Sequence, residues 1–138
     1  MLSYIKIVKK STKILIIIQR SNGDVFLSAS LIKKISDYYQ SPKIDLLVND
    51  DTKEIAGLLP YINFIHTFSY NKKKSNWLKQ EKHLIAAIYK KYDLSISLTS
   101  SDRSVVYAFL AGKKSISSIE LDHHKSWWKK IILNSYYY

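Results

Sequence analysis

Two adjoining segments near the start of the chain decide the expected fold: Lys13-Ile-Leu-Ile-Ile-Ile18 and Gln19-Arg-Ser-Asn-Gly-Asp24. An uninterrupted run of aliphatic, mostly β-branched residues is typical of a strand that is buried on both faces. The polar, turn-forming residues that follow predict a loop. Apolar residues then recur at helical spacing over Val25–Tyr39, until Pro42 ends the pattern. The stretch therefore predicts one strand–loop–helix unit of an α/β protein.

The same alternation continues to the end of the chain. Further strands are predicted at Ile44–Val48, Phe64–Phe68, Asp93–Leu98 and Lys114–Leu121. Helices are predicted from the capping segment Asn49–Thr52 to about Leu59, over Trp77–Lys91, and over Arg103–Ala111 with Gly112 as its C′ residue. A Lys-rich loop is predicted at Tyr70–Asn76, and a short helix or strand at Trp127–Leu133. This pattern favours right-handed βαβ units, and hence an α/β domain with a five-stranded, Rossmann-like parallel sheet and helices on both faces. We expect a single domain over residues 1–138, with a core that includes Ile16, Ile18, Leu46, Val48 and Ile96.

The composition excludes several classes of protein. The 138 residues include no cysteine, which excludes a disulfide framework, a Cys-ligated zinc site and a thiol nucleophile. The three glycines do not form a dinucleotide-binding fingerprint or a Walker A loop. No apolar run is long enough to span a bilayer and no signal peptide is visible, so we expect a cytoplasmic protein.

The charge of the chain is strongly positive, with 22 Lys+Arg against 11 Asp+Glu and a net charge of +11, which favours polyanionic partners. Only Arg20 and Arg103 are arginines, and they fall in the loops Gln19–Asp24 and Thr99–Arg103 after the first and fourth predicted strands. Ligands of parallel α/β sheets bind at the carboxyl ends of the strands. Arginine at these two positions fits bidentate oxyanion binding, and it also fits a helix-capping or surface role.

Five segments of the chain carry a resemblance to a known family: residues 13–25 with the Ser-Asn-Gly-Asp-Val loop, and residues 43–48, 54–65, 92–104 and 110–114. In this order they resemble glycosyltransferase family 9, the ADP-heptose:lipopolysaccharide heptosyltransferases, and residues 13–25 look like the opening of that family. Residues 43–48 look like its second strand, and residues 54–65 like its next helix, Pro turn and third strand. Residues 92–104 and 110–114 look like its fourth strand, the following loop and a helix. The resemblance covers residues 13 to about 134.

The resemblance implies a GT-B fold, in which two Rossmann-like domains face each other across a cleft. The chain would be the N-terminal half, which binds an anionic saccharide or lipid-linked acceptor, and the C-terminal donor domain would be absent from it. The implied function is inverting transfer from a nucleotide sugar, with ADP-heptose as the expected donor, in lipopolysaccharide or cell-envelope glycan biosynthesis. No other cofactor is expected. The chain alone would be inactive, cytoplasmic and able to contact the inner face of the plasma membrane.

The resemblance also implies roles for individual residues. Asp24 would be the general base that takes the proton from the acceptor hydroxyl, and Gly23 would let the backbone turn tightly beneath the acceptor. Arg103 would pair with a carboxylate or phosphate of the acceptor. Further substrate-binding residues are expected at Arg20, Ser21, Ser100, Ser101, Lys72, Lys73 and Lys74. The lysine triplet fits a solvated loop or a membrane contact equally well, and Asn22 departs from the apolar residue that is usual in the family.

Three alternative interpretations rest on other residues. Asp122-His-His124 resembles the signature of the DHH metal phosphoesterases, but Asn22-Gly-Asp24 lacks one carboxylate that those enzymes need, which favours a surface turn without metal. A basic nucleic-acid-binding α/β domain fits the charge and the aromatic residues, although no nucleic-acid-binding motif is present and no nucleic acid is expected. Trp127-Trp128 beside Lys129-Lys130 fits a membrane-interface patch, or core packing of at least one tryptophan.

Overall fold

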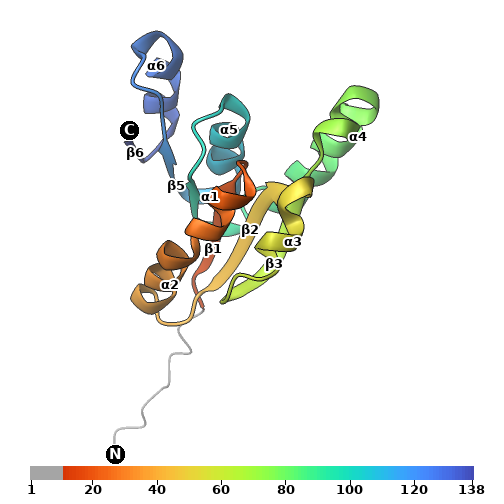
Figure 1. Cartoon of the computed structure of the whole chain (residues 1–138). Coiled ribbons are helices and arrows are strands. Elements are labelled where there is room, and N and C mark those ends of the chain that lie inside the picture. The colour runs from red at the N-terminus through yellow and green to blue at the C-terminus, as the bar shows by residue number, and fades with distance from the viewer. Residues whose placement is uncertain (1–10) are drawn as a thin grey trace, which may run out of the picture.

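The computed structural model describes residues 11–138, apart from the side chains of residues 72–75. Six parallel strands form one sheet in the order β3-β2-β1-β4-β5-β6 (Figure 1). The strands are β1 (Lys13–Ile18), β2 (Lys43–Asn49), β3 (Ile62–Phe68), β4 (Tyr92–Ser97), β5 (Gly112–Ser118) and β6 (Ser135–Tyr137). The predicted Rossmann-like parallel sheet is confirmed, and β6 is a strand that the sequence analysis did not predict.

Helices cover both faces of this sheet, as predicted (Figure 1). They are α1 (Asn22–Leu27), α2 (Ala29–Tyr38), α3 (Lys53–Ala56), α4 (Tyr70–Ile88), α5 (Asp102–Ala111) and α6 (His123–Ile132), with a 3-10 turn, η1, at Asp50–Thr52. Helices α1, α2 and α3 pack against one face of β1 and β2, while α4 and α5 pack against the other. The segment predicted as a short helix or strand at Trp127–Leu133 is helical and belongs to α6. Its Trp128 packs against a small cluster that includes Val105 of α5, so one of the two tryptophans contributes to a core.

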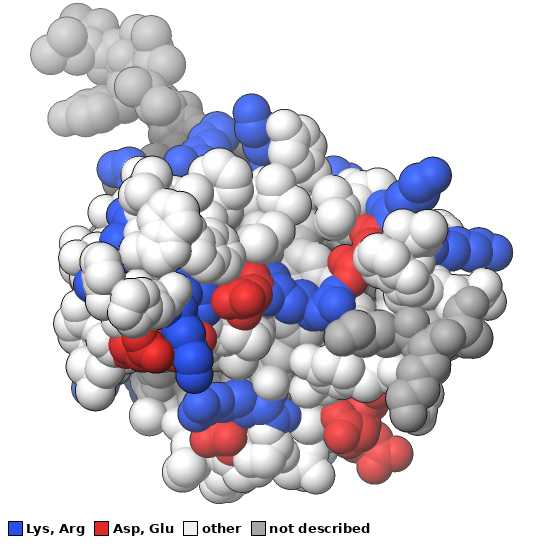
Figure 2. Space-filling view, turned by 90° about the horizontal axis from the view of Figure 1, so that it is seen from above, with Lys and Arg blue, Asp and Glu red and all other residues white. Residues whose placement is uncertain are grey.

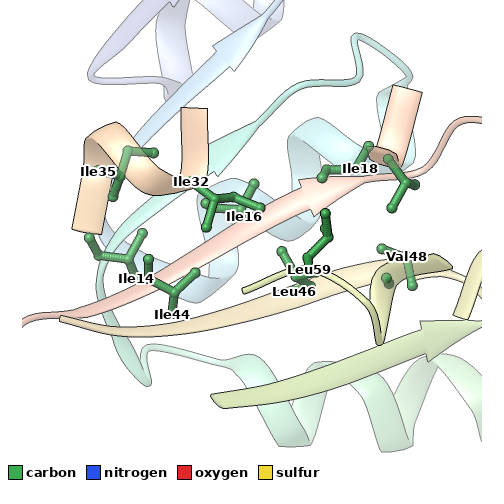
Figure 3. Packing of buried hydrophobic residues seen from close by; sticks show 11 residues of the cluster. Ile14, Ile16, Ile18, Ile32, Ile35, Ile44, Leu46, Val48 and Leu59 are labelled. Atoms are coloured by element: carbon green, nitrogen blue, oxygen red, sulfur yellow. The ribbon is translucent and has the colours of Figure 1, made fainter. Parts of the chain in front are cut away.

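Strand β1 is buried on both faces, as its aliphatic run predicts. Ile14, Ile16 and Ile18 are at most 1% exposed and pack toward α1, α2 and α3 (Figure 3). Leu15 and Ile17 are fully buried on the opposite face, against α4 and α5. Truncating any of these side chains to alanine should cost about 2–5 kcal/mol of stability.

The remaining predicted core residues follow the same alternation. Leu46 and Val48 of β2 are fully buried on the side of α1 (Figure 3). Ile96 of β4 is only partly buried and lies at the margin of that cluster. The prediction is therefore confirmed for the first two strands, and Ile96 is less buried than expected.

Two predicted helices have different limits in the structure. The helix expected over Val25–Tyr39 is divided at Ser28, whose hydroxyl donates to the Val25 carbonyl at 2.6 Å. Leu27, which helical spacing places on the apolar face with Leu31 and Ile35, is 73% exposed. The loop expected at Tyr70–Asn76 is helical and forms the first part of α4, with non-helical dihedral angles at Asn76.

The buried face of α4 matches the expected one only in part: Ile85 and Ile88 lie on it, as helical spacing predicts, and Leu78 does not. Leu78 is 61% exposed, whereas Leu84 and Ile88 are buried against β1 and α5. Helical spacing over Trp77–Lys91 places Tyr92 on the same face, but Tyr92 is the first residue of β4. Residues 77–79 are all exposed, so the first turn after the kink at Asn76 does not pack on the sheet, and the apolar contacts of the helix begin further along it.

Gly112 closes α5 as predicted, because its N–H donates to the Ala108 carbonyl, but it does so without the left-handed conformation of a C′ glycine. Its backbone is extended, with φ −102° and ψ 146°, and it is the first residue of β5. A Cβ atom at this position would lie 2.5 Å from the Lys114 carbonyl oxygen and 2.6 Å from the Ser95 hydroxyl. Glycine is therefore needed for the close approach of β4 and β5.

Within residues 11–138, no helix combines the length and the apolar character that crossing a membrane requires.

Candidate functional site

The candidate site lies at the carboxyl ends of β1 and β4, the two central strands of the sheet. The strand order reverses between them, because β2 and β3 extend the sheet on one side and β5 and β6 on the other. The two loops that contain the arginines follow these strands, so the prediction that both lie on one edge of the sheet is confirmed. Acidic and basic side chains are interleaved on this edge, which Figure 2 shows from above.

Gln19, which belongs to none of the predicted sites, joins the segments that meet at this edge. It is 7% exposed and follows β1 directly. Its backbone N–H donates to Thr99 Oγ1 at 3.0 Å, and its side-chain oxygen accepts from the Ser104 hydroxyl at 2.6 Å. Its amide nitrogen lies 3.4 Å from Asn49 Oδ1 at the end of β2. The sequence signal that could have identified Gln19 is its position, because it is a polar residue directly after a buried strand.

Asp24 is exposed and is the third residue of α1. Ser21 is the N-cap residue of this helix, and its hydroxyl donates to Asp24 Oδ2 at 3.0 Å. The bond orients one carboxylate oxygen and leaves Oδ1 outside that contact. The structure thus brings Ser21 and Asp24 together, as their shared loop suggested.

Gly23 does not have the tight-turn role that was expected. It is in α1 and its φ is not positive. A Cβ atom there would meet only the Ser21 hydroxyl, at 3.9 Å, so the space beside the backbone is open. The fold itself therefore does not require glycine at this position.

Arg103 lies in the first turn of α5, with its side chain 22% exposed. Its guanidinium forms an ion pair with Glu81 of α4 and donates to the Tyr107 hydroxyl at 3.1 Å. It also stacks over the Phe68 ring, with its central carbon 4.4 Å from the ring centroid. These contacts point the side chain toward α4 and the end of β3.

A cation at the start of a helix is unfavourable unless an anion is nearby, and for Arg103 the chain itself supplies that anion in Glu81. Tyr107 completes the group, because its hydroxyl donates to Glu81 Oε2 at 2.5 Å. Burial raises the pKa of Tyr107, and the nearby Arg103 opposes this shift. Glu81 and Tyr107 carried no sequence signal, since their partners come from other elements.

Asp24 and Arg103 belong to helices on opposite faces of the sheet. Val25, next to Asp24, packs in the cluster of α1, α2 and α3, whereas Tyr107, one turn after Arg103, packs in the cluster of α4 and α5. Both residues lie at the carboxyl edge. Their joint contact with one bound acceptor stays a prediction.

Ser100 and Ser101 precede α5 and have different partners. Ser101 is the N-cap residue of α5: its hydroxyl accepts from the Ser104 N–H at 3.3 Å and donates to the Ser104 hydroxyl at 2.8 Å. Because Ser104 in turn donates to Gln19, this cap is connected to the loop after β1. The Ser100 carbonyl accepts from Lys129 of α6.

Arg20 is exposed in the loop after β1. It lies near Tyr137 of β6, whose hydroxyl donates to the Ser97 carbonyl at 3.3 Å. Burial raises the pKa of Tyr137, and the positive charge of Arg20 partly opposes that shift. Lys72, Lys73 and Lys74 fall in α4, and their side chains lie outside the described residues.

Asp122 has a capping role at the start of α6. Its carboxylate accepts from the His124 N–H at 2.9 Å, and its backbone carbonyl accepts from the Ser126 hydroxyl. Asp122, His123 and His124 therefore form an exposed helix start. In the part of the chain that the structure describes, no three His, Cys, Asp or Glu side chains are grouped so that they could hold a metal ion.

No family model matches the chain. It is 30% identical over 114 residues to lipopolysaccharide heptosyltransferase 3 of Escherichia coli, a match that covers 80% of this chain and 34% of that protein. Among solved structures, E. coli heptosyltransferase WaaC with ADP aligns with a TM-score of 0.75 at 16% identity, over 92% of this chain and 42% of WaaC. The glycosyl transferase family 9 protein of Veillonella parvula aligns with a TM-score of 0.71 at 13% identity, over 92% of this chain and 36% of its own length.

The structural likenesses establish the class of fold, a Rossmann-like α/β domain that heptosyltransferases contain. The chain spans about a third of the length of its curated relative. Over the part that it spans, the chain is similar to a heptosyltransferase in sequence and to a glycosyltransferase family 9 protein in fold, which agrees with the resemblance seen in the sequence.

Proposed function

We propose that this chain is the acceptor-binding half of a GT-B heptosyltransferase in lipopolysaccharide biosynthesis. The observation that carries the proposal is the position of Asp24, an exposed carboxylate just after β1 at the edge where the strand order reverses. It occurs in a chain whose curated relative is a lipopolysaccharide heptosyltransferase. A carboxylate at this edge is suited to remove a proton from a bound hydroxyl.

In the proposed reaction, Asp24 accepts the proton of an acceptor hydroxyl as that oxygen attacks the anomeric carbon of the donor heptose. The bond from the anomeric carbon to the diphosphate breaks, ADP leaves with the electron pair, and the configuration inverts. Ser21 holds Oδ2 of Asp24 by its hydrogen bond, so that Oδ1 is the oxygen that accepts the proton. The open space beside Gly23 lets a saccharide approach the backbone next to the base.

The acceptor would be an anionic saccharide or lipid-linked sugar, bound along the loops after β1 and β4. Arg20 is exposed at this edge and can pair with a phosphate or carboxylate. Arg103 is proposed as a second anchor, since its guanidinium has donors beyond those that Glu81 and Tyr107 occupy. Ser100, Ser101 and the triplet Lys72, Lys73 and Lys74 are proposed to contribute further contacts.

The donor would be ADP-heptose, bound by a second domain outside the residues of this chain. One solved neighbour carries ADP and another an ADP-heptose analogue, which supports this choice of donor. The reaction would occur in the cytoplasm, at the inner face of the plasma membrane. The excess of lysine favours contact with anionic lipid there.

Calorimetry with the chain and deacylated lipopolysaccharide core oligosaccharide tests the binding part of this proposal. The chain should bind the oligosaccharide and should not bind ADP-heptose tightly. Micromolar binding of ADP-heptose, or no binding of the oligosaccharide, would contradict the division of roles.

A fusion of this chain to the donor domain of E. coli heptosyltransferase 3 tests the base. Asp24→Asn should lower kcat by about 10²–10⁴-fold while acceptor binding is retained, because the shape stays and the proton acceptor is lost. Asp50→Asn is the matched control, since Asp50 is also an exposed acid and follows β2, the neighbour of β1 in the sheet. A kcat near the unsubstituted value in Asp24→Asn would refute the assignment.

A further inference from the structure

Lys129 is the one charged side chain that is buried among the residues the structure describes. It lies on α6 and its side chain is 0% exposed. Its Nζ donates to both carboxylate oxygens of Glu120 at 2.9 and 2.8 Å, and to the Ser100 carbonyl at 2.5 Å. It also lies 2.9 Å from Asp102 Oδ1. An ammonium has three N–H groups, so the three acceptor residues satisfy it fully.

These acceptors come from three different parts of the chain. Ser100 is in the loop after β4, Asp102 is the first residue of α5, and Glu120 follows β5. One ammonium therefore connects the loop at the candidate site to both neighbouring segments. The loop is held from the other side by Thr99, which accepts from the Gln19 N–H.

Stability alone does not explain this arrangement. Desolvating the lysine is costly, whereas its carboxylate partners Glu120 and Asp102 remain 29% and 77% exposed. Apolar residues of similar size often replace buried ion pairs without loss of stability. A buried ammonium that binds acceptors from three segments does specify one arrangement of the segments that it joins. In this chain those acceptors flank Ser101 and Arg103, two of the proposed acceptor contacts.

We propose that Lys129 is a positioning residue for acceptor binding, which fixes the loop Thr99–Asp102 in its binding geometry. The proposal rests on the proposed function, because the loop must contact the acceptor for its geometry to affect binding. Lys129 itself touches no substrate.

Lys129→Met tests this proposal, since methionine keeps an unbranched apolar side chain and removes the charge. Lys125→Met is the matched control, because Lys125 is an exposed lysine on the same helix. Amide hydrogen exchange should accelerate about tenfold or more at residues 99–104 in Lys129→Met, while residues 14–18 and 44–48 exchange as before. The dissociation constant for the deacylated core oligosaccharide should rise about tenfold under conditions where the variant is fully folded.

Unchanged exchange at residues 99–104, or unchanged oligosaccharide affinity in a folded Lys129→Met, would overturn the proposal. If Lys129→Met does not fold, Glu120→Gln decides by the same two measurements, because it weakens the cluster and keeps its shape. It should give smaller changes in the same direction, and no change would count against the proposal. If the unsubstituted chain does not bind the oligosaccharide, the proposed function fails, and the exchange measurement still reports whether Lys129 holds the loop.

Discussion

The hydrogen bond from the Ser104 hydroxyl to Gln19 predicts a measurable coupling between the loop after β1 and the start of α5. At 2.6 Å it joins two buried side chains that are 85 positions apart in the sequence. Gln19→Leu removes the acceptor, and Ser104→Ala removes the donor together with the partner of Ser101. Each single substitution should destabilise the chain by about 1–3 kcal/mol, the cost of leaving a buried polar group without its partner.

The two effects should not add, because each variant loses the same hydrogen bond. Urea unfolding of both single variants and of the double variant should give a coupling free energy of about 1 kcal/mol. Ser126→Ala is the matched control, because it removes a buried hydroxyl that bonds to Asp122 and shares no partner with Gln19. Gln19→Leu and Ser126→Ala should add to within about 0.5 kcal/mol. Additivity of Gln19→Leu with Ser104→Ala would refute the inferred connection of the two loops.

Two further predictions concern residues outside this connection. Gly112→Ala should lower the free energy of unfolding by about 1–3 kcal/mol in a urea titration, because the added Cβ would overlap Ser95. Gly23→Ala should leave the free energy of unfolding nearly unchanged in the same titration, because the space beside Gly23 is open. Burial lowers the pKa of His66, so the unfolded chain binds a proton at this histidine more readily than the folded chain does. The free energy of unfolding should therefore fall as the pH drops below about 6.5, and it should level off below the pKa of the folded state. Urea unfolding at several pH values should show a shallower loss in His66→Gln; identical slopes would contradict this.

The sequence alone determined the class of fold and the edge of the sheet where the site lies. The aliphatic run Lys13–Ile18 specifies a strand buried on both faces, because no face of it can be presented to water. Once several such strands alternate with helices, parallel pairing follows, and the loops after β1 and β4 must share an edge. Asp24 and the two arginines could therefore be assigned to that edge from order and spacing.

The sequence could not determine features that depend on phase or on distant partners. The first predicted helix is divided at Ser28, and α4 packs on the sheet only beyond its first turn after Asn76, so Leu27 and Leu78 are exposed where the helical period placed them on an apolar face. Strand β6 has three exposed residues, and its tyrosines carry no apolar alternation that would mark a strand. This strand forms because its backbone pairs with that of β5 in parallel.

Only the tertiary structure decided the partners of the polar side chains at the site. Glu81 is 22 residues from Arg103, Gln19 is 85 residues from Ser104, and Lys129 is 29 residues from Ser100. Local sequence carries no record of such pairs, because they form only when the sheet brings separate loops to one edge. The local pattern of apolar and polar residues thus predicted the strands, the loops and the candidate base. The partners of each charged side chain depended instead on the packing of segments that are far apart in the chain.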